Sequence, residues 1–174
     1  DKANNPLGVR SVFDGDDKAI TCPVRFREHW IVAEDAAAFF FPADTKWTTL
    51  TDVKLKDANG KSAGNIDIVL VAYNEHGTIT DFGALEIQSV SISGNVRRPF
   101  DRYMISPSRR NLMDWSREKN YPYPDYLSSS HKRLAPQLIF KGGIFRSWNK
   151  KTAVALNRSF FETLPPLKEV SPAA

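Results

Sequence analysis

Three polar side chains interrupt two otherwise apolar segments in the middle of the chain, and their types suit metal-ion chemistry. Asp67 lies near the start of the run IDIVLVAY, and Glu86 and Gln88 lie in the run GALEIQSV. Side chains two residues apart on a strand point to the same face, roughly 7 Å apart, so Glu86 and Gln88 should project together. A charge in a central strand is costly unless it is paired or binds a metal. Two converging carboxylates, with no Lys or Arg between them in the sequence, predict a site for Mg²⁺.

The same residue types suit the hydrolysis of a phosphodiester bond. Mg²⁺ held by Asp67 and Glu86 would polarise the scissile phosphate and lower the pKa of a bound water. Gln88 would position the attacking water by hydrogen bonding, although its amide has no charge to offset the developing negative charge. That electrostatic work would then fall on metal ions or on an arginine of residues 97–110.

A purely structural interpretation competes with the metal site. In that interpretation Glu86 forms an ion pair with an arginine such as Arg97, and Asp67 only caps a turn. The pattern of an aspartate followed at a distance by Glu-x-Gln is short and matches many sequences by chance. The spacing alone therefore leaves both interpretations open.

The elements that must position these side chains form a predicted β-hairpin. Residues 66–73 predict a strand, NEHG at 74–77 a turn, and residues 78–92 a long second strand. Apolar residues on both faces place this hairpin in the middle of a sheet. The Ala-rich segment 30–41, which Pro42 ends, predicts a buried helix. Together these elements predict an α/β domain with a central mixed sheet flanked by helices.

The last third of the chain predicts a helix followed by shorter elements. Residues 128–141 predict a helix that begins at three serine caps and is kinked or restarted at Pro136. Gly142 and Gly143 are expected to end it. A strand over residues 144–148 is expected to follow, and then either an amphipathic stretch or a strand–helix over residues 150–164.

Composition limits the class of protein. The chain has 174 residues, of which 41% are hydrophobic and 25% charged, which is typical of one globular domain and excludes a disordered or collagen-like chain. Its longest apolar runs, such as residues 68–73, fall far short of a bilayer span, so we expect no membrane segment, and we expect no secretory signal. The single cysteine, Cys22, excludes an internal disulfide framework and indicates a reducing compartment.

The charge is distributed unevenly along the chain. Residues 1–96 carry 9 Lys and Arg against 14 Asp and Glu, whereas residues 97–158 carry 14 against 4. This basic region also contains many aromatic residues, which favours a folded surface for nucleic acid over the solvated face that charge runs often form. A loop is expected at residues 93–100, and guanidinium groups in this loop and beyond it could clamp phosphates or read guanine edges. The candidate DNA contacts are Arg97, Arg98, Arg102, Arg109, Arg110, Lys132 and Arg133.

These residues also carry a resemblance to a known family. The order of Asp67 and Glu86-Ile87-Gln88 is similar to the PD-(D/E)XK nuclease core, with glutamine in place of lysine. Residues 5–26, 64–104 and 125–145 resemble the NotI restriction endonuclease family, and the long block from EIQ to GNVR is far more specific than a three-residue pattern.

The resemblance implies a restriction-endonuclease-like core and a type II restriction enzyme of the bacterial cytoplasm. Such an enzyme hydrolyses double-stranded DNA as a homodimer with Mg²⁺, for which Mn²⁺ can substitute, at a palindromic GC-rich site. The resemblance implies that Asp67, Glu86 and Gln88 are catalytic and that Asp67 and Glu86 bind the metal. Nucleases of this core sometimes place an acid of a helix near the metal, and Glu34 is the candidate for that supporting role, although a solvated or capping acid is the plainer interpretation.

The N-terminal part departs from the family. The family carries a four-cysteine iron site there, but this chain has only Cys22, and Arg10 stands where a cysteine is expected. One thiolate cannot hold a tetrahedral metal. Either the structural iron site is lost, or its other ligands lie before residue 1 or have been replaced. We therefore expect residues 1–29 to be an irregular arm, a remnant of that site or a departure from it, and residues 30–174 to be the nuclease domain, truncated relative to the family.

Two other functions stay open at this point. A catalytically silent or truncated DNA-binding module predicts that DNA is retained without Mg²⁺ and that no product forms. A structure-specific repair or recombination nuclease on the same core predicts cleavage that follows the structure of the DNA and not its base sequence.

Overall fold

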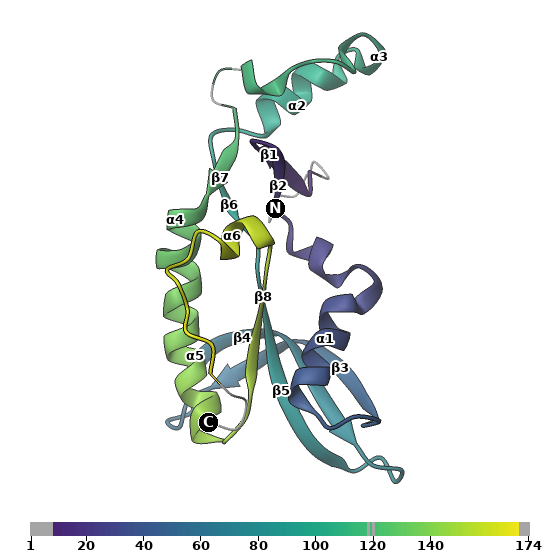
Figure 1. The fold of residues 1–174 in the computed structure, drawn as a ribbon, viewed down its shortest axis with the longest axis vertical. Helices are drawn as coiled ribbons and strands as arrows, with labels where there is room; N and C mark the ends of the chain where they lie inside the picture. The colour runs from purple at the N-terminus through teal and green to yellow at the C-terminus, as the bar shows by residue number, and fades with distance from the viewer. Residues whose placement is uncertain (1–8, 118, 120, 171–174) are drawn as a thin grey trace. The chain divides into compact units, whose positions relative to one another are not determined.

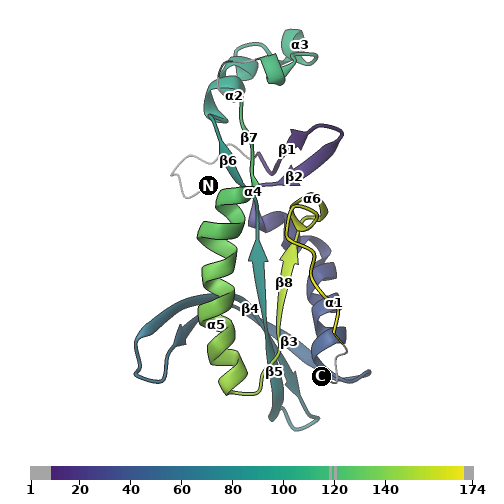
Figure 2. The ribbon, with the colours of Figure 1, turned by 60° about the vertical axis from the view of Figure 1, so that its left-hand side comes forward.

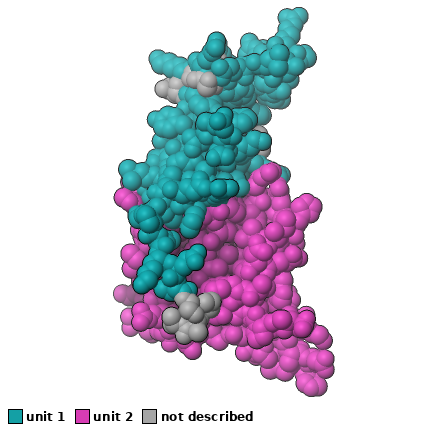
Figure 3. Space-filling view, in the orientation of Figure 1, with its two compact units in different colours: residues 1–22, 89–130, 157–174 teal, residues 23–88, 131–156 magenta. Residues whose placement is uncertain are grey.

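A computed structural model describes residues 9–117, 119 and 121–170 (Figures 1 and 2). The chain divides into two compact units, coloured separately in Figure 3. Unit 1 comprises residues 1–22, 89–130 and 157–174, and unit 2 comprises residues 23–88 and 131–156. Asp67, Glu86 and Gln88 all belong to unit 2.

Unit 2 is built around a four-stranded mixed sheet with the strand order β3-β4-β5-β8. The first three strands pair antiparallel and β8 lies parallel to β5. The strands are β3 (Trp47–Lys56), β4 (Ser62–Tyr73), β5 (Ile79–Gln88) and β8 (Thr152–Leu156). The predicted hairpin is therefore present, and it is internal to the sheet, as its apolar faces indicated. Its second strand was predicted too long, because it ends at Gln88 and not at residue 92.

Helices cover both faces of this sheet. Along β5 successive side chains point to opposite faces. The Phe40 ring lies against Gly83, whereas Phe145 packs in one core cluster with Ala84, so the two helices that carry these rings lie on opposite faces (Figure 2). These helices are α1 (Ile31–Phe40) and α5 (Ala135–Ser147). The arrangement confirms the predicted class, a mixed α/β domain with a central sheet.

Helix α1 confirms the prediction for residues 30–41. Its buried side chains are Ala33, Ala36, Ala37 and Phe40, which share one face because they recur at a spacing of three or four residues. The helix ends where the chain becomes extended before Pro42. Its other face is exposed. The helix therefore packs by one face only, whereas the sequence predicted a buried helix.

The helix predicted over residues 128–141 is longer than expected at both ends. It runs from α4 (Tyr126–Ser128) through a π-helical segment (Ser129–Leu134) into α5. The N-cap is Asp125, whose carboxylate accepts a hydrogen bond from the Ser128 N–H at 2.9 Å, so the serine caps were predicted wrongly. The π-helical segment lies just before Pro136, whose ring cannot continue the regular hydrogen-bond pattern.

The expected end at Gly142 and the expected strand over residues 144–148 are both wrong. Helix α5 continues to Ser147, and Phe145 is fully enclosed in the core of unit 2. A helical glycine costs only about 1 kcal/mol relative to alanine, which the burial of one large aromatic ring outweighs. Strand β8 and the short helix α6 (Arg158–Phe161) show that, of the two alternatives for residues 150–164, the strand–helix is present.

Unit 1 contains short elements. Where an irregular arm was expected, β1 (Ser11–Asp14) and β2 (Asp17–Ile20) form a hairpin, because Gly15 supplies the positive φ of +61° that its two-residue turn needs. The loop expected over residues 93–100 gives way to a helix at Arg97. Strand β6 (Ser91–Ser93) pairs with β7 (Tyr123–Asp125). Unit 1 also contains the helices α2 (Arg97–Met104) and α3 (Pro107–Arg110) and a 3-10 turn at Trp115–Arg117. A further 3-10 segment, Pro23–Trp30, belongs to unit 2. Within the described ranges no helix has the length and apolar character needed to cross a membrane.

Candidate active site

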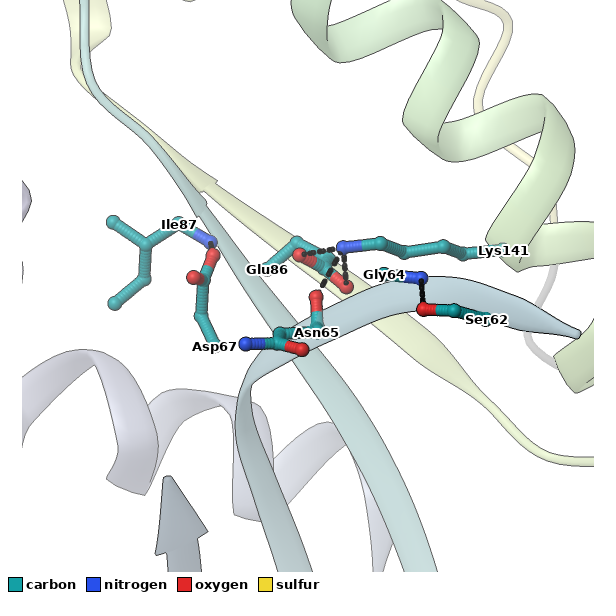
Figure 4. A network of polar contacts seen from close by, with 7 residues as sticks. All are labelled: Ser62, Gly64, Asn65, Asp67, Glu86, Ile87 and Lys141. Carbon is teal, nitrogen blue, oxygen red and sulfur yellow. Dashed lines mark hydrogen bonds and ion pairs between the residues drawn. The ribbon is translucent and has the colours of Figure 1, made fainter. Parts of the chain in front are cut away.

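Asp67 and Glu86 lie on neighbouring strands, directly beyond the point where β4 and β5 stop pairing. The last backbone pair is Ile68 with Leu85, and Asp67 and Glu86 are the next residues on each strand. The Ile87 N–H therefore has no partner on the β4 backbone, and it donates a hydrogen bond of 2.8 Å to the Asp67 Oδ2 atom (Figure 4). This bond fixes the orientation of the half-buried Asp67 carboxylate.

Glu86 is buried, and its carboxylate faces a lysine that the sequence analysis did not identify. Only 4% of the Glu86 surface is exposed. The Lys141 Nζ atom lies 2.9 Å from both the Oε1 and Oε2 atoms of Glu86 and 2.5 Å from the Asn65 carbonyl oxygen. Figure 4 shows this lysine reaching Glu86 from α5. The purely structural interpretation is therefore correct that Glu86 forms an ion pair, but the partner is Lys141 and not an arginine such as Arg97.

The surroundings of Glu86 make its carboxyl group harder to ionise. Burial has the largest effect and raises the pKa, and the hydrogen bond and charge of Lys141 oppose it. The charge of Asp67 and a side-chain hydrogen bond with Asp67 raise the pKa further, so that the net shift is upward. Asp67 and Glu86 are thus electrostatic neighbours, in keeping with their positions next to the last backbone pair of β4 and β5.

Gln88 is the last residue of β5 and lies two positions beyond Glu86, on the same face of the sheet. Its side chain is buried, with 8% of its surface exposed. The structure thus brings all three predicted residues of the strands to one end of β5. Asp67 is held by the Ile87 amide and Glu86 by Lys141.

The donor set of this site fits a hard divalent cation. Mg²⁺ is usually bound by one or two carboxylates together with waters and substrate phosphates. Asp67 and Glu86 supply two carboxylates, and in the described part of the chain no group of three or more His, Cys, Asp and Glu side chains forms a larger metal cage. Glu34 is exposed on α1, which packs on the face of β5 opposite to Glu86, and it is not among the groups that shift the pKa of Glu86. Its supporting role stays a prediction.

Most of the candidate DNA contacts lie on the surface of unit 1. Arg97, Arg98 and Arg102 are exposed on α2 and line a shallow depression of about 440 Å³ together with Asn95, Asp101 and Ile105. The Asn95 side chain accepts a hydrogen bond of 3.0 Å from the Arg98 N–H at the start of this helix. Three guanidinium groups at one depression form a suitable site for phosphate oxygens.

The other basic candidates are divided between the two units. Arg109 and Arg110 lie in α3, where the Arg110 guanidinium donates a hydrogen bond to the Arg102 carbonyl oxygen and so orders the surface next to α2. Lys132 and Arg133 are exposed in the π-helical segment that precedes α5. They lie inside the helical run that begins at Tyr126 and not at its N-terminus.

The thiol of Cys22 is free and half-buried. Because no cluster of three metal-binding side chains occurs among residues 9–117, 119 and 121–170, the described residues give Cys22 no partners for the structural iron of the sequence prediction. Residues 1–8 lie outside the described part of the chain. The fate of that iron site and the boundary at residue 29 stay predictions.

Comparison with known protein families gives a match over almost the whole chain. The family model described as restriction endonuclease NotI matches residues 9–174, which include every candidate site residue named above. A comparison with curated proteins gave no match. The family match confirms the resemblance found in the sequence.

Proposed function

The chain belongs to the NotI restriction endonuclease family, and we propose that it is a type II enzyme that hydrolyses phosphodiester bonds of double-stranded DNA with Mg²⁺. The single observation that carries the proposal is the pair of Asp67 and Glu86 at one end of β5, inside a mixed sheet with α1 and α5 on its faces. We assign this sheet and its two helices to the restriction-endonuclease-like PD-(D/E)XK core. Gln88 takes the position that lysine holds in the common motif.

Asp67 and Glu86 are the residues that would hold the metal. Bound there, Mg²⁺ or Mn²⁺ would polarise the scissile phosphate and lower the pKa of an attacking water. The hydrogen bond from the Ile87 N–H keeps Asp67 in place, so little reorganisation is needed when the metal binds. Glu86 must be ionised for this role, and Lys141 favours the ionised form.

Gln88 supports the reaction by hydrogen bonding. Its side-chain amide offers both a donor and an acceptor next to Glu86, so it can orient a water without removing the proton from it. Because an amide supplies no charge, positive charge at the reacting phosphate must come from the metal and from basic side chains. No covalent enzyme intermediate is required.

The basic surface of unit 1 would hold the DNA. Arginines such as Arg97, Arg98 and Arg102 contact phosphates, and such contacts make affinity fall steeply with salt. If the recognition site is a palindrome, and we propose a GC-rich one, a two-fold homodimer is the natural geometry because each subunit then meets the same half-site. As a restriction enzyme, the protein would act in the bacterial cytoplasm, where its DNA substrate is found.

Replacing one carboxylate tests the proposal. Glu86→Gln keeps the volume of the side chain but removes its charge, and it should abolish cleavage while leaving the affinity for duplex DNA within a few fold. The matched control is Glu75→Gln, in the turn between β4 and β5, where the side chain is 85% exposed and lies 3.6 Å from Lys46. The control should cut like the unaltered protein.

The outcomes separate the competing functions. Continued cleavage by Glu86→Gln would overturn the site assignment. Retention of DNA by the unaltered protein with no product at any Mg²⁺ concentration would support a binding module. Cleavage of branched DNA in preference to linear duplexes, without a common end sequence, would support a structure-specific nuclease.

A further inference from the structure

Lys141 is the only buried basic side chain among the described residues, with 7% of its surface exposed. An ammonium group has three N–H donors and no acceptor. Three acceptors surround the Lys141 Nζ atom: the two Glu86 carboxylate oxygens, each at 2.9 Å, and the Asn65 carbonyl oxygen at 2.5 Å. Every donor of the ammonium therefore has a partner, as a buried charge requires.

The position of this lysine is determined by the packing of α5. Phe145 lies one turn further along the helix, on the same face, and is 1% exposed in the core of unit 2. The lysine stem passes Gly64, whose missing Cβ would lie 3.7 Å from the Lys141 Cε atom (Figure 4). Anchored at Phe145, the helix places the ammonium group at Glu86.

This arrangement conflicts with a metal ion at Glu86 in the free protein. Both carboxylate oxygens already accept hydrogen bonds from Lys141, so each has one lone pair fewer to offer a divalent cation. The cation would then lie next to the ammonium group in a buried site, where like charges repel more strongly than in water. Metal binding and the ion pair therefore compete for the same carboxylate.

The balance of charge changes when a DNA phosphate enters. In the free site, two carboxylates and one ammonium leave a single negative charge, which a divalent cation overcompensates. A phosphate group adds one negative charge, so that two carboxylates, one phosphate, one ammonium and one divalent cation together are neutral.

We infer that Lys141 couples metal binding to the arrival of the DNA phosphate, because it serves as the counter-cation of Glu86 in the free protein and weakens metal binding there. The inference rests on the proposed metal site at Asp67 and Glu86. Lys141 is in this sense a positioning residue, since it acts through Glu86. Its effect is on metal affinity without DNA, which can be measured apart from cleavage.

The test is thermal unfolding at pH 8 in increasing concentrations of Mg²⁺ alone, without DNA. Lys141→Met should lower the Tm in the absence of Mg²⁺, because it leaves Glu86 buried without its partner. Mg²⁺ should then raise the Tm of this variant with a midpoint concentration at least about tenfold lower than for the unaltered protein, because binding to the folded state alone stabilises it. Lys141→Arg, which keeps the charge, should behave like the unaltered protein.

Two further variants keep the test decisive. Lys141→Gln removes the charge but can still donate to Glu86, and it serves if the methionine variant does not fold. Lys150→Met removes another lysine of unit 2 that pairs with a carboxylate, Asp81 at 2.5 Å, and it should leave the Mg²⁺ midpoint unchanged. Adding Glu86→Gln to Lys141→Met should abolish the Mg²⁺ effect, which assigns the effect to this site.

An equal or higher Mg²⁺ midpoint in both neutral variants would overturn the role of Lys141 and leave the metal site intact. If Mg²⁺ raised the Tm of neither the unaltered protein nor any Lys141 variant, the metal site itself would be refuted, and with it the inference. A lowered midpoint that persisted in the presence of Glu86→Gln would also overturn the inference, because the metal would then bind elsewhere.

Discussion

Gly83→Ala should destabilise the protein by a direct clash between α1 and the strand that carries the site. Gly83 lies in β5, three residues before Glu86. A Cβ atom added there would lie 2.4 Å from the Cδ2, 2.6 Å from the Cγ and 2.7 Å from the Cε2 atom of the Phe40 ring. Carbon atoms pack favourably at about 3.5–4.0 Å, so the ring would have to retreat by about 1 Å.

The ring has little room to retreat. Phe40 is 5% exposed, and its centroid lies 5.7 Å from that of Phe39 and 6.0 Å from that of Phe41. Adding atoms to a packed core costs about 1–3 kcal/mol, and a clash with an enclosed aromatic ring belongs at the upper end. For a domain of this size, about 3 kcal/mol corresponds to a fall in Tm of about 6–12 °C.

Thermal unfolding followed by circular dichroism measures this effect. Gly142→Ala is the matched control, because it also adds one methyl group to a glycine of unit 2 but meets no atom within 4 Å. It should stabilise α5 by about 0.5–1 kcal/mol. In a Phe40→Ala background the ring is absent, so Gly83→Ala should then cost almost nothing. Equal costs in both backgrounds, or a neutral Gly83→Ala in the unaltered protein, would refute the proposed clash.

The remaining predictions concern pH, DNA affinity and backbone strain. Because the pKa of Glu86 is raised on folding, the folded protein keeps the Glu86 proton to a higher pH than the unfolded chain does. The free energy of unfolding therefore falls as the pH rises from the ordinary pKa of a glutamate through the folded value. Glu86→Gln should remove this component from the measured pH dependence of the Tm. Arg98→Gln and Arg102→Gln should each weaken duplex binding and reduce the slope of log affinity against log salt by about one, with no change in the slope contradicting a phosphate contact. Gly64→Ala should lower the Tm because the φ of +94° is strained for any L side chain, whereas unchanged stability would show that the strand relaxes there.

The central hairpin and α1 could be predicted because their signals are local. Two apolar faces identify a strand in the middle of a sheet, and Pro42 ends an Ala-rich helix. Strand β3 was not predicted, since its sequence is largely polar and Leu50 is 53% exposed at an edge of the sheet. The glycine pair in α5 was misleading because the burial of Phe145, a tertiary effect, determines whether the helix continues.

The candidate site shows the same limit. Asp67, Glu86 and Gln88 could be found from the sequence because charged and amide groups are unusual in apolar strands. Lys141 could not be assigned to them, since it is separated from Glu86 by 55 residues and no spacing rule connects a helix with a strand at that distance. A single lysine within the apolar run LIFKGGIF was the available signal.

Digestion of a long duplex DNA of mixed sequence, with and without Mg²⁺, followed by sequencing of the fragment ends, tests the central claim most directly. The account predicts discrete fragments that share one palindrome at their ends, formed by the unaltered protein and by Glu75→Gln only when Mg²⁺ is present, and no fragments from Glu86→Gln. The same fragments from Glu86→Gln or without a divalent cation, or no product although DNA is retained at low salt, would contradict it.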